Sequence, residues 1–167
     1  MSAPDHDERR LTLPAGRSAE RGTAPVLVVG FDGQSASLAA LRTAAGLARR
    51  LGADLHVVHG VDVRDYPIDS DAAVEVWEGR AREALDHLHA QVRDALADHP
   101  GEWVYHAWNG EPVRLLVTVA DEQDALMIVV GTHRHRPLSR MMRRSVSRGL
   151  PTAAHRPVLL VADPAGR

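Results

Sequence analysis

Short apolar runs alternate with amphipathic stretches along most of the chain. Each run consists mainly of Val, Leu, Ile and Ala, and each is bounded by Gly, Pro, Asp or Asn, as is typical of strands. Because the runs are continuous rather than alternating, they indicate strands that are covered on both faces, as in a parallel sheet. The predicted strands are 25–31, 55–61, 103–108, 125–131 and 157–161.

The stretches between these runs place apolar residues at helical spacing. The first predicted helix begins at Ser35, a residue type that caps helix N-termini, and ends at Gly52, which suits a left-handed C-terminal position. Pro112 is tolerated in the first turn of the third helix. The predicted helices cover about 35–51, 72–98, 112–120 and 145–154.

Strands that alternate with helices predict parallel βαβ units with right-handed crossovers. The expected fold class is therefore α/β, with a single open five-stranded parallel sheet in the order 3-2-1-4-5 and helices on both faces. The domain is expected to cover 24–163. Residues 1–23 are polar and without periodicity, which predicts a flexible N-terminal tail, and 164–167 form a short C-terminal tail.

Composition narrows the class of protein. Hydrophobic residues make up 44% of the 167 residues and aromatic residues only 4%, so the core is expected to be aliphatic. The absence of Cys excludes disulfides and thiolate metal sites. The N-terminus lacks the apolar segment of a secretory signal, and no run approaches the roughly 18 apolar residues of a membrane span. These features predict a cytoplasmic protein without membrane contact.

The charges are unevenly distributed. The chain has no Lys, so its 20 cationic side chains are all Arg, which excludes a phosphate-binding Walker lysine and a Schiff base. Residues 131–162 carry seven Arg and no acid, and because the whole chain carries −2, the remainder carries −9. The basic segment lacks interleaved aromatic residues and the remainder repels phosphates, so nucleic acid is not the expected partner.

The predicted strand order places a ligand site where that order reverses. Open parallel sheets bind ligands beyond the carboxyl ends of their strands at this point, here between the first and fourth strands. Gly30, Asp32 and Gly131 lie at the carboxyl ends of those two strands. Glycine lets a ligand approach the backbone closely. The alternative is that these glycines only make tight turns, but an acid at the same point favours a site.

Five segments together resemble the universal stress protein family: VLVVGFDGQSASLAAL, HVVHGV, NGEP, ALMIVVGT and SVSRGLPTAAHRPVLLV. The resemblance covers about 24–162, and its order and spacing are more specific than any one segment. It implies a Rossmann-like fold of the adenine nucleotide alpha hydrolase type and a role in stress response. It also implies that Gly30 and Asp32 lie near adenine and ribose, and that Gly60 lies near the base.

Members of the family that bind ATP carry a loop of the form Gly, two residues, Gly, nine residues, Gly, then Ser or Thr. Gly131 and Ser145 stand at the first and last of these positions, whereas Arg134 and Arg144 replace the second and third glycines. An arginine there either fills the phosphate cup and abolishes ATP binding, or offers a guanidinium fork to the phosphates. The sequence leaves both alternatives open.

These observations predict a regulatory module rather than an enzyme. Its cofactor would be ATP, AMP or another small phosphorylated ligand, bound without a metal through Asp32, Gly131, Ser145 and the two arginines. Asp32 has no evident partner for catalysis, so at most weak ATP hydrolysis is expected. His133 and His135 indicate a solvated loop more than a metal site, and His59 and His106 indicate core or rim residues. The alternative function is an adaptor that binds no nucleotide and contacts a protein partner through its Arg-rich segment.

The last predicted strand suggests self-association. Residues 157–161 are apolar, and in the predicted order they form a sheet edge, which invites pairing with another strand. Pro157 stands only at the start, so the remaining backbone groups are free to pair. Members of the family often dimerise through this strand. The sequence therefore predicts a two-fold homodimer with antiparallel pairing of 157–161.

Overall fold

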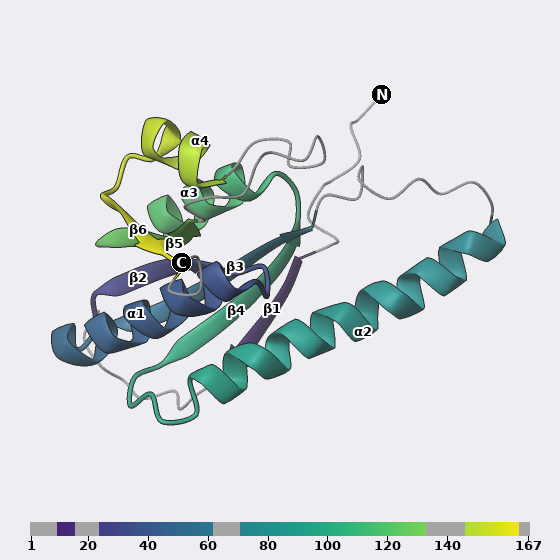
Figure 1. The fold of residues 1–167 in the computed structure, drawn as a ribbon, viewed down its shortest axis with the longest axis horizontal. Helices are drawn as coiled ribbons and strands as arrows, with labels where there is room; N and C mark the ends of the chain where they lie inside the picture. The colour runs from purple at the N-terminus through teal and green to yellow at the C-terminus, as the bar shows by residue number, and fades with distance from the viewer. Residues whose placement is uncertain (1–9, 16–23, 62–70, 133–145, 164–167) are drawn as a thin grey trace.

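The computed structural model describes residues 10–15, 24–61, 71–132 and 146–163, and gives the backbone alone for 10–15, 61 and 71–81. Figure 1 shows a twisted sheet with helices on both of its faces. The sheet has the order β1-β4-β3-β2-β5-β6. Its strands are β1 (Arg10–Ala15), β2 (Val26–Gly30), β3 (Asp54–Val61), β4 (Trp103–Asn109), β5 (Met127–Thr132) and β6 (Val158–Ala162).

Strands β4, β3, β2, β5 and β6 are all parallel to their neighbours in that order. This confirms the five-stranded sheet and the 3-2-1-4-5 order expected from the apolar runs. In the centre, β2 pairs with β3 on one side and with β5 on the other, so Val28 lies opposite both His56 and Ile128. The reversal of strand order consequently falls between β2 and β5.

Strand β1 was not expected. It pairs antiparallel with β4, from Arg10 opposite Trp108 to Ala15 opposite Trp103. The sequence predicted a flexible tail over 1–23, and residues 10–15 of that segment form this strand. The outer edge of β4 leaves backbone groups that a further strand can satisfy, and Leu11 and Leu13 have the two-residue period of a strand. Pro14 is compatible with an edge position.

In the described parts of the chain, four helices connect the parallel strands: α1 (Ser35–Leu51), α2 (Asp71–Ala95), α3 (Pro112–Glu122) and α4 (Val146–Ala153). Gly52 ends α1 with φ 63° and donates its N–H to the Ala48 carbonyl, as the sequence predicted. The N-cap of α1 is Gln34 rather than Ser35, and its side chain makes no capping bond. Glu111 caps α3 by accepting the Arg114 N–H at 3.0 Å. None of the described helices has the length and apolar character that a membrane span needs.

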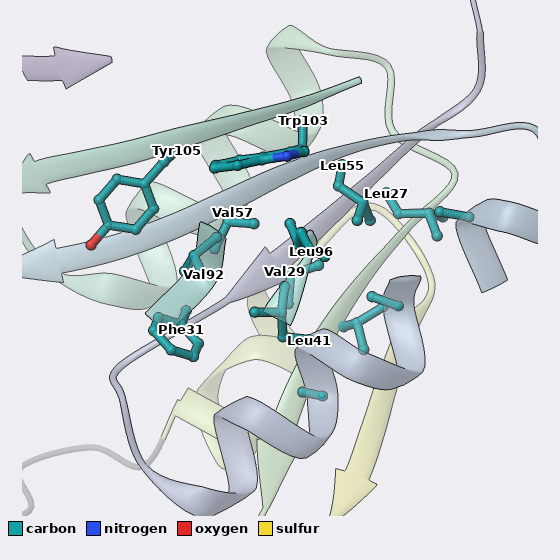
Figure 2. Packing of buried hydrophobic residues seen from close by; sticks show 14 of the residues in the cluster. Leu27, Val29, Phe31, Leu41, Leu55, Val57, Val92, Leu96, Trp103 and Tyr105 are labelled. Atoms are coloured by element: carbon teal, nitrogen blue, oxygen red, sulfur yellow. The ribbon is translucent and has the colours of Figure 1, made fainter. Parts of the chain in front are cut away.

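Two hydrophobic clusters form the core, one on each face of the sheet. Figure 2 shows the first, in which Leu27 and Val29 of β2 lie between Leu41 of α1 and the side chains of β3. Val28 points to the other face and packs in the second cluster with α3 and Leu150 of α4. The core is mainly aliphatic, but β4 contributes the large buried aromatics Trp103, Tyr105 and Trp108.

Candidate functional site

The carboxyl ends of β2 and β5 lie side by side at the centre of the sheet. The parallel pairing of Val29 with Val129 brings Gly30 and Asp32, which follow on one strand, to the same edge as Gly131 on the other. The strand order thus places Asp32 and Gly131 together, as expected. Asp32 itself is exposed, and it stands three residues before the first residue of α1.

Local hydrogen bonds hold the turn that carries Asp32. Its Oδ1 accepts the Gln34 N–H at 2.9 Å, so the carboxylate closes an Asx turn. The Asp32 N–H donates to Ser37 Oγ at 3.3 Å, and Ser37 Oγ donates to the Gln34 carbonyl at 2.9 Å. The carboxylate therefore has a defined place beside the N-terminus of α1. An ionised carboxylate only accepts hydrogen bonds, so this edge suits a ligand that offers hydroxyl or amine donors.

Gly131 is needed for packing against α1. A Cβ on this residue would lie 2.3 Å from both C and O of Ala36 and 2.7 Å from the Ser37 nitrogen. Contacts this short with backbone atoms cannot be relieved by rotating a side chain. The missing side chain of Gly131 therefore lets the end of β5 touch the first turn of α1, where the sequence suggested approach by a ligand.

Gly30 and Gly60 also make close contacts, on the side of the sheet covered by α3. A Cβ at Gly60 would lie 3.1 Å from Cα and Cγ of Pro112. A Cβ at Gly30 would lie 3.0 Å from Val130 Cγ1 and 3.3 Å from Leu116 Cδ1. Both glycines let α3 pack closely against the carboxyl ends of the strands. Their predicted contact with an adenine base stays a prediction.

Two residues at this edge were not assigned to the site from the sequence. His59, near the end of β3, lies with Nδ1 2.9 Å from the Phe31 carbonyl oxygen. Asp163, directly after β6, accepts a hydrogen bond from Ser35 Oγ at 2.5 Å and donates its N–H to the Thr132 carbonyl at 3.0 Å. The strand-end rule that found Asp32 would also have found Asp163, because both follow parallel strands of one sheet.

Three of the predicted ligand residues, Arg134, Arg144 and Ser145, lie outside the described residues. Helix α4 begins at Val146, one residue after Ser145. The alternatives for the two arginines stay predictions. His133 and His135 also lie outside the described residues, and the described part of the chain contains no group of three or more His, Asp or Glu side chains that could hold a metal ion.

A partly buried pair of histidines joins β3 and β4. His106 Nε2 is 3.0 Å from His56 Nδ1, and the His106 ring meets the Trp108 ring edge-on at 5.0 Å. His106 is 5% exposed, which agrees with the core role predicted for it. Burial, and then the charge of His56, lower the pKa of His106 to about 4. Burial also lowers the pKa of His56, against an opposing effect of Asp54.

A cavity of about 210 Å³ lies at the amino ends of the strands, where β3 and β4 begin. Its wall includes Arg49, Asp54, His99 and Glu102. Asp54 Oδ1 accepts the Glu102 N–H at 3.1 Å, which ties two of these loops together. The cavity is thus separated by the length of the strands from the turn that carries Asp32, and we assign it no part in the candidate site.

Known proteins resemble this chain in sequence and in fold. The universal stress protein MJ0531 of Methanocaldococcus jannaschii is 26% identical over 140 residues, which cover 83% of this chain and 82% of that protein. A universal stress protein of Archaeoglobus fulgidus, solved in complex with dAMP, is 27% identical with a TM-score of 0.54 and covers 83% of this chain and 97% of its own.

A universal stress protein solved in complex with cAMP has a TM-score of 0.59 at 21% identity and covers 85% of this chain and 99% of its own. This likeness concerns the fold alone. The family model for universal stress proteins matches residues 25–162, from the residue before β2 to the end of β6. By this match and by its sheet order, the chain belongs to the universal stress protein family.

Proposed function

We propose that the chain is a non-catalytic regulatory module that binds an adenine nucleotide, ATP or AMP, or another small phosphorylated ligand. The observation that carries this proposal is the prearranged turn at Asp32, which stands where the strand order reverses between β2 and β5. The related protein of Archaeoglobus fulgidus that was solved with dAMP supports the same class of ligand.

We propose that different residues contact the ribose, the base and the phosphates of the ligand. Asp32 accepts hydrogen bonds from the ribose hydroxyls, because its carboxylate is exposed and its turn is already formed. Gly30 and Gly60 lie near the base, at strand ends against which α3 packs closely. Gly131, Ser145 and the arginines at 134 and 144 serve the phosphates, since a guanidinium fork matches phosphate oxygens.

The proposed role is binding rather than turnover. Oδ1 of Asp32 is occupied by the Gln34 N–H, which suits a group that positions a ligand more than one that must exchange a proton. The whole sequence lacks the lysine on which many phosphoryl-transferring sites depend. Adenine nucleotide should therefore be recovered chemically unchanged after prolonged incubation with the protein.

The two arginines give the proposal a sharp test. If they hold phosphate, Arg144→Ala should weaken ATP binding by about tenfold or more while adenosine binding changes little, because a charge-assisted bond is lost. If they fill the cup, the double variant with Arg134→Gly and Arg144→Gly should bind ATP where the parent does not. Calorimetric titration with ATP and adenosine separates these cases, and unchanged ATP affinity in both variants would contradict a phosphate role for the loop.

We also propose that the protein forms a two-fold dimer through β6, which ends the described sheet opposite β1. The adaptor function, in which no nucleotide is bound, rests on the same assembly. Leu160 on β6 is 44% exposed, whereas Leu159 packs against the first core cluster. Leu160 therefore tests the sheet edge with less disturbance of the core than Leu159, which would combine both effects.

Sedimentation at micromolar concentration should show a dimer of the parent chain and a shift toward monomer for Leu160→Asp, because a charge at an apolar strand edge opposes pairing. Leu126→Asp is the matched control, since Leu126 is 45% exposed but precedes β5, which is an interior strand of the sheet. A parent that stays monomeric, or a Leu160→Asp variant that dimerises like the control, would count against this interface.

A further inference from the structure

His59 joins two strand ends beside the candidate site. It belongs to β3, where its backbone lies opposite Ala107 of β4. Its ring reaches in the opposite direction, towards the end of β2. There Nδ1 lies 2.9 Å from the carbonyl oxygen of Phe31, the residue immediately before Asp32. The backbone ladder continues up to this point, since the Phe31 N–H donates to the Val58 carbonyl at 2.9 Å.

The partner of His59 determines where its ring proton lies. A carbonyl oxygen can only accept a hydrogen bond, so Nδ1 must carry the hydrogen and donate it. In the neutral ring this leaves Nε2 without a hydrogen, since a neutral imidazole carries one N–H. The contact with Phe31 thus selects one of the two neutral tautomers.

The Phe31 carbonyl belongs to the peptide group that precedes Asp32, so its position affects the turn. Phe31 is 3% exposed, and its side chain packs in the first core cluster, which fixes the position of the residue. Beyond it, Asp32 is held by the Gln34 N–H and by Ser37 Oγ, both from the start of α1. His59 of the neighbouring strand β3 adds a hydrogen bond to the residue that precedes Asp32.

The following residue leaves little freedom for a different path. Gly33 has φ 78°, in the left-handed region, and a Cβ on it would lie 2.5 Å from Leu88 Cδ2 of α2. The chain from Phe31 to Gln34 is therefore confined by β3, α1 and α2 together. Loss of the His59 hydrogen bond should let the peptide plane before Asp32 tilt and should move the carboxylate.

From these contacts we propose that His59 is a positioning residue for Asp32: its Nδ1–H holds the Phe31 carbonyl and thereby fixes the Asp32 carboxylate toward the ligand. This inference rests on the proposed nucleotide site for its effect on affinity. Its structural part, the tautomer and the fixed turn, holds for the protein without any ligand.

Asparagine and leucine at position 59 form a matched pair. The amide nitrogen of Asn stands as many bonds from Cα as Nδ1 of His, so His59→Asn keeps the donor. His59→Leu has the same branched shape as Asn but offers no hydrogen. AMP affinity should stay within about threefold of the parent in His59→Asn and fall by about tenfold in His59→Leu, which is the range for loss of one hydrogen bond.

A double-mutant cycle tests whether His59 acts through Asp32. If it does, His59→Leu should weaken AMP binding in the parent but have no further effect in the Asp32→Ala background. Equal weakening in both backgrounds would overturn the positioning role, because His59 would then act on the ligand or on the fold as a whole. Thermal unfolding of each variant verifies that binding is measured on folded protein.

Two measurements on the unliganded protein keep this inference separate from the nucleotide proposal. Nitrogen NMR of the histidine rings should show His59 with its hydrogen on Nδ1, and the Gln34 amide should exchange several-fold faster in His59→Leu than in His59→Asn. A hydrogen on Nε2, or equal exchange in the two variants, would overturn the inference. If these results hold but the parent binds no AMP, the proposed function fails and the role of His59 in fixing the turn remains.

Discussion

Replacing Gly131 with alanine is expected to lower the free energy of unfolding by about 3 kcal/mol, at the upper end of the usual cost of overpacking. The added methyl group would lie 2.3 Å from backbone atoms of Ala36, and backbone cannot give way as a flexible side chain does. Either α1 moves off the end of β5 or the strand end shifts. In both cases the turn that carries Asp32 loses its support, so ligand affinity should fall as well.

Gly46 provides the matched control within the same helix. It lies inside α1, and a Cβ there would meet no atom within 4 Å. Gly46→Ala should therefore raise the free energy of unfolding by about 0.5–1 kcal/mol, since alanine favours a helix over glycine. Urea unfolding of the two variants beside the parent gives the comparison. Equal stability of Gly131→Ala and the parent would contradict the described packing of β5 on α1.

Acidification is expected to cost the fold about 3 kcal/mol through His106 between pH 6.5 and about pH 4. The pKa of this histidine falls from its ordinary 6.5 to about 4 on folding, because its ring is buried beside His56. Each pH unit corresponds to about 1.4 kcal/mol. In this window the unfolded chain binds the proton and the folded chain does not, so stability falls as pH decreases.

Below about pH 4 this contribution stops changing, because His106 is then protonated in both states. His56 acts in the same direction, since burial lowers its pKa as well. Carboxylates also titrate in this range, so the control is His106→Gln, whose amide can still bond His56 but does not titrate. The parent should lose more stability than the variant between about pH 7 and pH 4. Parallel pH profiles for the two proteins would contradict a neutral, buried His106.

The sequence was sufficient to predict the parallel sheet and its order, because continuous apolar runs and helical periodicity are local properties. It did not predict β1, since a six-residue edge strand is stable only against the free edge of β4. Ser35 was expected to cap α1 but is its first residue, and its hydroxyl binds Asp163, 128 residues later. Such a contact depends on the folded sheet and leaves no local pattern.

The candidate site was predicted in position but only partly in chemistry. Asp32 was found from its place after β2, because the carboxyl ends of parallel strands meet at one edge. Gly131 was interpreted as room for a ligand, whereas the structure shows it in contact with the backbone of Ala36. Both explanations require a missing side chain, so sequence alone could not separate them. The bond from His59 to Phe31 likewise depends on the register between β3 and β2.

Calorimetric titration of nucleotide-stripped protein with AMP, ATP and cAMP, with Asp32→Ala titrated beside the parent, tests whether Asp32 belongs to an adenine nucleotide site. We expect saturable binding of at least one of these nucleotides to the parent, and affinity lower by about tenfold or more in Asp32→Ala, because a charged hydrogen-bond acceptor is lost. Absence of binding to the parent up to millimolar concentration, or equal affinity in the two proteins, would contradict an adenine nucleotide site at Asp32.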